Sequence, residues 1–246
     1  MMSFMNSLEH LSDFQQALQN YKPSEAAQKL LQNMKLVLLV GPTSSGRNTI
    51  INTLLESGNY HSIVSDTTRQ PRENNGVLEQ NGREYWFRTE EELLADIKKG
   101  AFLEAAVIHN QQVSGISMRE LTSAADQGLI AINEIEVAGA DNIHSIKPDA
   151  LCLFILPPSF DEWMARMTAR GQLPAEEVRR RLESAVYEIT TALDRDFYQF
   201  VVNDTFIQTA ARIDKMITTN LLNEHQDEGR RVAEALLAST KQHLAS

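Results

Sequence analysis

The sequence predicts an α/β fold in which a parallel β-sheet is covered by helices on both faces. From Lys35 onward, apolar segments of strand length alternate with amphipathic segments of helix length. The strand-like segments are short and almost wholly apolar, as expected for parallel strands that are buried on both faces. A glycine-bracketed turn joins the first of these strands to the first following helix. The 246 residues suffice for one substantial core with additions at both ends.

The individual elements follow from hydrophobic spacing. The N-terminal residues are expected to be helical because apolar side chains from Leu8 to Tyr21 recur every three or four positions, and Pro23-Ser24-Glu25 suits the start of a second helix. Strands are expected at 36–40, 61–65, 84–87, 102–108, 129–136, 151–156 and 199–204, with helices between them at about 47–57, 89–99, 117–127, 138–145, 160–170 and 174–195. The polar stretch 69–83 predicts a loop or hairpin, and 205–246 predicts one or two helices.

Composition and charge exclude several classes of protein. The net charge of −10 argues against general binding of nucleic acid, which requires a basic face. The one cysteine, Cys152, lies in the apolar segment ALCLFIL and cannot form an internal disulfide. No segment reaches the roughly 18 uninterrupted apolar residues of a membrane span, and the N-terminus lacks a secretory pattern. The expected location is therefore the cytoplasm, with no membrane partner.

A loop with the spacing of a phosphate-binding P-loop follows the first predicted strand. Four residues separate Gly41 from Gly46, and the helix-like segment TIINTLLES follows. In this setting the backbone N–H groups of the loop and of the helix N-terminus point at a phosphate. The usual motif ends in Gly-Lys-Ser/Thr, whereas this chain has Gly46-Arg47-Asn48. The loop is predicted to bind phosphate through a variant motif.

Each altered position has a known task in a P-loop. Arg47 keeps the positive charge that a lysine brings to the β- and γ-phosphates, but carries it on a wide planar group. Asn48 replaces a hydroxyl that would bind Mg²⁺ and offers a neutral amide oxygen. Thr49 points about 100° further around the helix, so it substitutes imperfectly for that hydroxyl. Whether the protein transfers a phosphoryl group or only keeps the shape of a protein that does depends largely on Arg47 and Asn48.

Two arginines follow the second predicted strand. Arg69 and Arg72 lie three residues apart, are braced by Pro71 and are preceded by hydroxyl side chains that begin at Ser65. Such a pair suits a two-pronged clamp for a dianionic phosphate. A solvated turn with ordinary surface arginines would have the same composition. The aromatic strand 82–87 comes next.

Acidic residues occur on, or directly after, otherwise apolar strands. Glu104 interrupts the segment 102–108, and Glu134 and Glu136 follow the apolar segment that begins at Leu129. Ligands bind at the carboxyl ends of the strands in an open α/β sheet. Carboxylates near a buried strand are costly without partners. The expected partners are a metal–nucleotide complex or the N–H groups of a base.

An arginine-rich stretch spans residues 166–181. A solvated helical face is the usual interpretation of such a charge run. However, Arg166 and Arg170 are four residues apart on one helix, and Gly171 and Pro174 mark a hinge before the next helix. A mobile lid would present arginines to a transferring phosphoryl group in this way.

In their order along the chain, these features resemble guanylate kinases from about Lys35 to Met216. The family pattern is a P-loop, Ser-x-Thr-Thr-Arg-x-Pro-Arg, Gly-x-x-Tyr-x-Phe, Phe-hydrophobic-Glu, an acidic strand end before Gly, Pro-Pro-Ser, an arginine-bearing lid ending in Arg-Gly, Arg-Leu, and Val-Asn-Asp. After the loop, this chain supplies the segments 65–72, 82–87, 102–104, 134–139, 157–159, 166–171, 181–182 and 202–204. The combination in this order is specific for the family.

The resemblance implies a P-loop NTPase-type parallel sheet covered by helices, with a small β-rich monophosphate-binding subdomain and a helical lid. The family-like domain is expected at 34–216, with the GMP-binding subdomain at about 66–117 and the lid at 160–182. Residues 1–33 and 217–246 are expected to be helical extensions. They would pack on the main domain, on a second copy of the chain or on a partner.

The resemblance also implies ATP-dependent phosphorylation of GMP or dGMP by in-line transfer with Mg²⁺, with small-molecule nucleotides as the partners. Donor-site residues would hold ATP: Gly41, Thr43, Ser44, Ser45, Gly46, Arg47, Asn48, Thr49 and Asn203, the last near the adenine. Acceptor-site residues would hold GMP: Ser65, Arg69, Arg72 and Tyr85 at the phosphate, and Glu104, Glu136 and Ser114 at the base. The catalytic charges would be Arg47, Arg166, Arg170 and Arg181, and Mg²⁺ would meet Asn48 and Glu134, directly or through water.

The chain departs from the family pattern in several places. The loop between Arg72 and Tyr85 is longer than usual, and the family's Tyr-Tyr-Gly-Ser/Thr is replaced by residues within 112–116. One phosphate-binding tyrosine is therefore absent, and a contact to the guanine O6 would have to come from Ser114 or Ser117. Two alternatives to an active kinase stay open: a binding module that uses the monophosphate pocket for a phospho-ligand or partner, and a nucleotide-binding regulator or a phosphotransferase with another acceptor.

Overall fold

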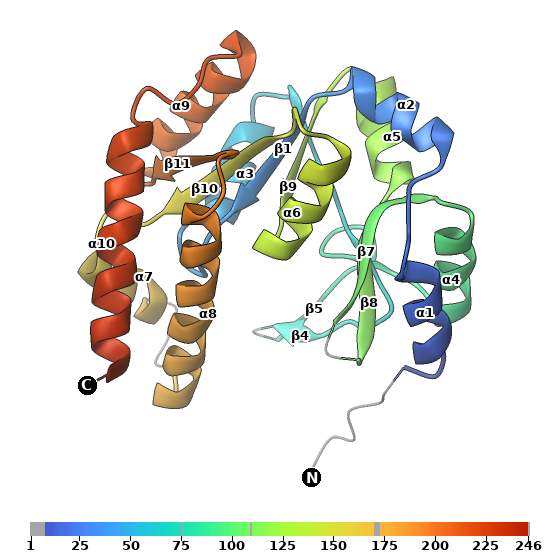
Figure 1. The fold of residues 1–246 in the computed structure, drawn as a ribbon, viewed down its shortest axis with the longest axis horizontal. Helices are drawn as coiled ribbons and strands as arrows, with labels where there is room; N and C mark the ends of the chain where they lie inside the picture. The colour runs from blue at the N-terminus through green and yellow to red at the C-terminus, as the bar shows by residue number, and fades with distance from the viewer. Residues whose placement is uncertain (1–7, 75, 109, 170–172, 246) are drawn as a thin grey trace. The chain divides into compact units, whose positions relative to one another are not determined.

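The computed structural model describes residues 8–74, 76–108, 110–169 and 173–245 (Figure 1). The chain divides into two compact units. Unit 1 comprises the N-terminal segment to Lys35 together with Ser62–Ala131, and unit 2 comprises Leu36–His61 together with the chain from Ile132 onward. None of the helices in the described part is long and apolar enough to cross a membrane.

A five-stranded sheet contains five of the seven predicted strands, and the predicted strands at 84–87 and 102–108 contribute to a separate sheet. The order of the five-stranded sheet is β11 (Tyr198–Val202), β10 (Leu151–Leu156), β1 (Leu36–Val40), β9 (Ile130–Glu134) and β2 (Tyr60–Ser62). β10 runs parallel to both β1 and β11. All five side chains of β1 are buried, because helices cover both faces of the sheet there. The prediction of a parallel sheet covered by helices is confirmed.

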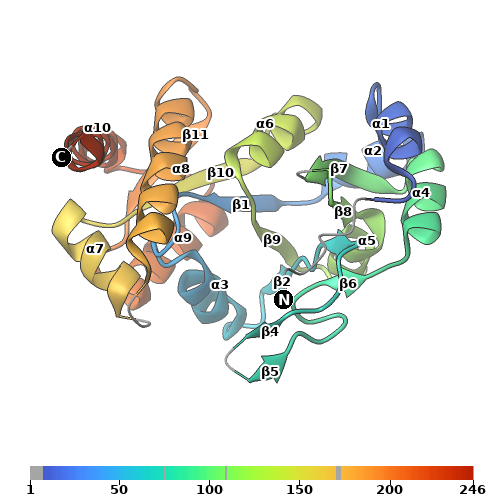
Figure 2. The ribbon, with the colours of Figure 1, turned by 90° about the horizontal axis from the view of Figure 1, so that it is seen from below.

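The helices of unit 2 lie on both faces of this sheet. Figure 2 shows α6 (Val137–Ile146) and α8 (Ala175–Leu193) on one side, and α3 (Arg47–Leu55) and α9 (Phe206–Thr219) on the other. α10 (Gln226–Ala245) packs against α8, β11 and α7 (Phe160–Thr168). Ser159 caps α7 by accepting a hydrogen bond of 3.2 Å from the Glu162 N–H. These helices hold the loops at the strand ends.

Unit 1 contains a smaller, mostly antiparallel sheet of order β6 (Trp86–Phe87), β3 (Asp66–Thr67), β8 (Gln112–Ser117) and β7 (Phe102–Ile108). A separate hairpin, β4 (Glu73–Asn74) and β5 (Val77–Leu78), lies within the stretch that was expected to be a loop or hairpin. β8 was not predicted from the sequence, because its segment QVSGIS alternates between apolar and polar residues too weakly.

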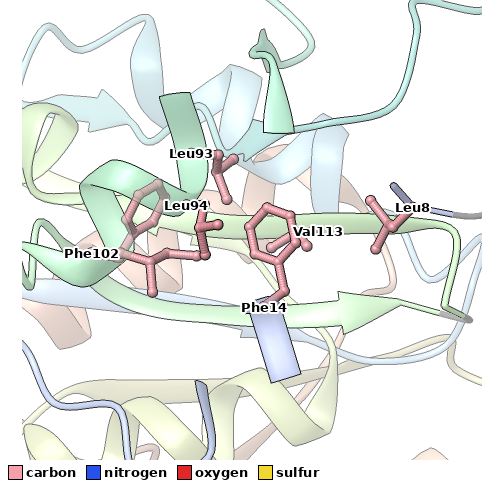
Figure 3. Packing of buried hydrophobic residues seen from close by; sticks show 7 residues of the cluster. Leu8, Phe14, Leu93, Leu94, Phe102 and Val113 are labelled. Atoms are coloured by element: carbon pink, nitrogen blue, oxygen red, sulfur yellow. The ribbon is translucent and has the colours of Figure 1, made fainter. Parts of the chain in front are cut away.

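The helices of unit 1 are α1 (Leu11–Leu18), α2 (Glu25–Asn33), α4 (Glu90–Lys98) and α5 (Met118–Asp126). Thr89 and Glu92 form a capping box at the start of α4. Phe14 of α1, Leu93 of α4 and Phe102 of β7 are fully buried in one hydrophobic cluster (Figure 3). The first N-terminal helix, α1, therefore shares a core with α4 and the small sheet.

Candidate active site

The P-loop of unit 2 is held by two glycines with positive φ. Gly41 has φ of 138°, and a Cβ there would lie 2.3 Å from the Ile155 carbonyl oxygen. Gly46 has φ of 100°, and a Cβ there would lie 2.2 Å from Nδ2 of Asn203. Any other residue would be strained at either position and would collide with neighbouring atoms. α3 begins at Arg47, so its free N–H groups face the loop.

Two side chains distant in sequence brace this loop. Asn203, directly after β11, donates from Nδ2 to the Ser45 carbonyl oxygen at 2.8 Å, and Trp163 of α7 donates from Nε1 to the Thr43 carbonyl oxygen at 2.8 Å. Both side chains are buried. The family resemblance places Asn203 near the adenine, and in the structure its amide holds the loop while the residue also lines the neighbouring pocket. Sequence reasoning missed the role of Trp163, which reads as an ordinary apolar residue of an amphipathic helix.

A pocket of about 450 Å³ opens beside the loop. It is lined by residues of the P-loop, α3, α7 and the chain after β11, namely Ser44, Gly46, Thr49, Arg166, Ala169, Asn203, Asp204, Thr205 and Phe206. The pocket combines loop N–H groups, a guanidinium and an aromatic ring. That composition suits a ligand with an anionic end and a flat apolar end.

Arg47 forms an ion pair within unit 2. Its Nη2 lies 2.8 Å from Oε1 of Glu134, which ends β9, and 15% of the Arg47 side chain is exposed. Because Arg47 is the first residue of α3 and Glu134 ends a neighbouring strand, their charges meet at the carboxyl edge of the sheet. The structure thus brings together two residues that the sequence placed far apart.

Asn48 and Glu134 can supply oxygen ligands to Mg²⁺. Asn48 is exposed on the first turn of α3, and Glu134 is half-buried. Mg²⁺ is typically held by one or two carboxylates together with substrate phosphates and water, so one carboxylate and one amide oxygen fit that pattern. Among the described residues, no group of three or more His, Cys, Asp or Glu side chains is placed to hold a metal ion.

The lid arginines lie in different settings. Arg166 donates to the carbonyl oxygens of Asn203 and Asp204 at 3.0 and 3.2 Å, so it lines the pocket. Arg181 on α8 donates to Glu177 at 2.7 Å and is half-buried. Arg170 lies outside the described residues.

Unit 1 contains the arginine cluster. Arg69 forms a bidentate pair with Glu79, with Nη1–Oε2 and Nη2–Oε1 distances of 2.6 and 2.9 Å. Its guanidinium lies 4.6 Å from the ring centroid of Tyr85. The hydrogen bond from Arg69 is the main cause that lowers the pKa of Glu79 to about 2. Arg72 is exposed, and its backbone N–H donates to Glu79 at 2.9 Å.

Sequence reasoning missed two carboxylates in this cluster. Glu79 follows the β4–β5 hairpin, in a stretch whose polar composition indicated only a loop. Asp66 is fully buried one residue after Ser65, and it accepts hydrogen bonds from Arg88 at 3.0 Å and from Arg119 at 3.0 Å. A buried carboxylate with two guanidinium partners fixes the strand from which the cluster starts. Its partners lie too far along the chain for a local pattern to reveal them.

Glu104 lies on the small sheet opposite Ile116. The two residues are cross-strand partners of β7 and β8, so their side chains share one face. Burial raises the pKa of Glu104 to about 7, although a hydrogen bond from the Ile116 N–H acts in the opposite direction. Ser114 is paired with Ala106 instead, and its hydroxyl donates to Oγ1 of Thr67 at 2.8 Å. The hydroxyl of Ser117 is buried, with no hydrogen-bond partner among the described residues.

Glu136 belongs to unit 2 and precedes α6, where it is exposed. The candidate residues therefore form two groups. The P-loop, Arg47, Glu134, Glu136, Arg166, Arg181 and Asn203 lie in unit 2, whereas Ser65, Arg69, Arg72, Tyr85, Glu104 and Ser114 lie in unit 1. Each group contains cationic side chains of the kind that bind phosphate.

Comparison with known proteins shows the family to which the chain belongs. The guanylate kinase family matches residues 33–220. The chain is 34% identical over 185 residues to a guanylate kinase of Corynebacterium diphtheriae, covering 74% of this chain and 94% of that protein. It is 40% identical over 177 residues to a guanylate kinase of Trichormus variabilis, covering 70% of this chain and 83% of that protein. The crystal structure of guanylate kinase from Anaplasma phagocytophilum matches with a TM-score of 0.56 at 25% identity, over 78% of this chain and 89% of that one. The chain belongs to the guanylate kinase family.

Proposed function

We propose that this protein transfers the γ-phosphoryl group of ATP to GMP or dGMP. As a member of the guanylate kinase family it is a nucleoside monophosphate kinase. The observation that supports the assignment to this chain is the presence of two clusters suited to phosphate: the P-loop of unit 2, with its positive-φ glycines and Arg47, and the Arg69–Tyr85 cluster in unit 1. A protein that only bound a phospho-ligand through unit 1 would have no need for the first site.

On the donor side, the loop N–H groups and the N-terminus of α3 bind the ATP phosphates. Arg47 lies at the start of that helix and neutralises charge on the β- and γ-phosphates. Arg170 and Arg181 stabilise the charge on the phosphoryl group while it is transferred. Arg166 lines the pocket beside Asn203, so it orients the nucleotide at that wall. Mg²⁺, when bound near Asn48 and Glu134, supplies further neutralisation of phosphate charge.

On the acceptor side, Ser65, Arg69, Arg72 and Tyr85 hold the phosphate of GMP. Glu104 and Glu136 accept hydrogen bonds from the N1–H and the exocyclic amine of guanine. Because Ile116 lies opposite Glu104, the base faces an apolar side chain on that part of the sheet, and Ser114 contacts Thr67. Recognition of guanine therefore depends mainly on the carboxylates and less on a contact to O6.

The test is ADP release measured with ATP and Mg²⁺ over a panel of GMP, dGMP, IMP, AMP and UMP. We expect turnover with GMP and dGMP and much slower turnover with AMP and UMP. Absence of turnover with every acceptor, at high enzyme and Mg²⁺, would rule out the proposed activity. Calorimetry that showed binding of GMP without binding of Mg·ATP would then support the binding module.

The pH dependence of KM for GMP tests the role of Glu104. Only the ionised carboxylate of Glu104 can accept a hydrogen bond from the base with either of its oxygens. The pKa of Glu104 in the free protein is about 7. We expect KM to rise as the pH falls below 7, approaching about tenfold per pH unit. The phosphate of GMP also titrates, near pH 6. Glu104→Gln retains that titration, so the difference between the two profiles isolates Glu104.

The same pKa shift has a consequence for stability. The folded-state pKa of Glu104 lies above its ordinary value of 4.5, so the folded chain retains a proton that the unfolded chain has released. The free energy of unfolding therefore falls as the pH rises from about 4.5 to 7. Thermal melts of the parent should show this fall and those of Glu104→Gln should show less of it; identical profiles would contradict the buried state of the carboxyl.

The division of the chain into an N-terminal extension at 1–33, a family domain at 34–216 and a C-terminal extension at 217–246 remains a proposal, as does self-association through the terminal helices. The family match over 33–220 supports the division. Sedimentation of the full chain would give its oligomeric state.

A further inference from the structure

The N-terminal segment lies along the outer edge of β7. β7 is the last strand of the small sheet, so the backbone groups on its far side need partners from elsewhere. The Ser24 N–H donates to the Gly100 carbonyl oxygen at 3.0 Å, just before β7, and the Leu8 N–H donates to the Asn110 carbonyl oxygen at 3.5 Å, just after it. Residues 8–24 therefore follow the edge from one end to the other.

Between these two contacts, Tyr21 binds the backbone at the start of β7. Its hydroxyl donates to the Phe102 carbonyl oxygen at 2.7 Å and accepts from the Phe102 N–H at 2.8 Å. One side chain thus satisfies both polar backbone groups of one edge residue. Burial is the main cause of the raised pKa of the Tyr21 hydroxyl, although its hydrogen bond with the backbone of Phe102 acts in the opposite direction.

The contact coincides with an irregularity in the strand. Phe102 pairs with Ser117, but Glu104 pairs with Ile116, so the register shifts between Phe102 and Glu104. A bulge redirects the side chains that follow it. Glu104 is the first paired residue after this bulge, and Tyr21 holds the last paired residue before it.

The helix before Tyr21 is anchored in the core of unit 1. Figure 3 shows Phe14 beside Leu93, Leu94 and Val113; Phe14 is fully buried, and Leu8 belongs to the same cluster. The Tyr21 N–H donates to the Leu18 carbonyl oxygen at 3.3 Å, which ties the residue to the end of α1. The backbone of Tyr21 is therefore held in place by α1, and its hydroxyl can hold the start of β7.

We propose that Tyr21, which lies before the part of the chain matched by the family, is a positioning residue for recognition of the acceptor base: it holds the bulge in β7 that sets the direction of Glu104. The proposal rests on the proposed function, since Glu104 contacts the base there. Within the N-terminal segment this role belongs to the Tyr21 hydroxyl, and the other side chains of residues 8–24 stabilise unit 1.

The test compares Tyr21→Phe with the parent in steady-state assays. We expect KM for GMP to rise about three- to tenfold, the loss of a well-placed hydrogen bond, while KM for ATP stays unchanged and kcat changes less than twofold. The matched control is Ser24→Ala. It removes the cap of α2, where the Ser24 Oγ accepts from the Ala27 N–H at 3.3 Å, but it leaves the Tyr21 hydroxyl in place. It should lower the melting temperature and leave KM for GMP unchanged.

A double-mutant cycle separates positioning from general weakening. If Tyr21 acts through Glu104, Tyr21→Phe should have no further effect on KM for GMP in a Glu104→Gln background. Equal effects in both backgrounds, or a change in melting temperature without a change in KM, would overturn the proposal. If the parent itself fails to turn over GMP, the proposed function fails first. The same cycle read by calorimetry of GMP binding then decides whether Tyr21 supports the site.

Discussion

Replacing Arg47 with alanine is expected to lower kcat by roughly a thousandfold or more, with a smaller effect on KM for GMP. Charge on the transferring phosphoryl group is the main feature that the enzyme must stabilise, and removal of one aligned cation from such a site has effects of this order. Arg47 stands at the position where the usual P-loop motif has a lysine. Its guanidinium forms an ion pair with Glu134, with an Nη2–Oε1 distance of 2.8 Å, at the edge of the sheet. ADP release under saturating ATP measures the loss.

Arg47→Lys is the matched control, because it restores the charge without the planar fork. We expect partial recovery of kcat, since a lysine ammonium cannot make the two parallel hydrogen bonds that a guanidinium makes. Full parental activity in both variants would show that Arg47 does not contact the phosphates. Arg83→Ala serves as a surface control, since 68% of that side chain is exposed and its charge lies in unit 1.

The parts of the fold that sequence patterns predicted are those with strong local signals. The strands at 36–40, 102–108 and 151–156 have the predicted bounds, because each is a continuous run of mostly apolar residues beside a turn or helix signal. Ser24 caps α2, at the helix start that the sequence predicted. β8 was missed because its stability comes from pairing with β7 and β3, which a local pattern does not contain.

The candidate site divides in the same way. Phosphate-binding residues could be proposed from motifs, since the P-loop and the arginine pair are compact in sequence. The residues that hold these phosphate-binding residues in place could not be predicted from motifs. Asp66 is paired with Arg88 and Arg119, and Trp163 donates a hydrogen bond to the P-loop. Each of these supports is a contact between elements far apart along the chain. An ordinary residue type gives no sign of such a role until the fold places its partner.

Arg69→Ala is expected to lower kcat/KM for GMP by on the order of a thousandfold, because it removes a cation from the phosphate clamp and also leaves Glu79 without its bidentate partner. The pKa of Glu79 is about 2 beside Arg69, so this carboxylate is ionised at any assay pH in the parent. Without Arg69, its negative charge repels the phosphate of GMP. The loss should therefore exceed that of a simple missing contact. Steady-state kinetics over GMP concentration at fixed ATP measure it.

The double variant Arg69→Ala with Glu79→Gln distinguishes the two causes. Removing the uncompensated carboxylate should recover part of kcat/KM if repulsion contributes, and the recovery measures that share. No recovery would assign the whole loss to the missing cation. Glu79→Gln alone keeps the charge of Arg69 but weakens the bidentate pair, with distances of 2.6 and 2.9 Å, that orients the guanidinium. We therefore expect KM for GMP to rise and kcat to change little. In that case Glu79 acts by orienting Arg69, and the hairpin that precedes it belongs functionally to the phosphate clamp.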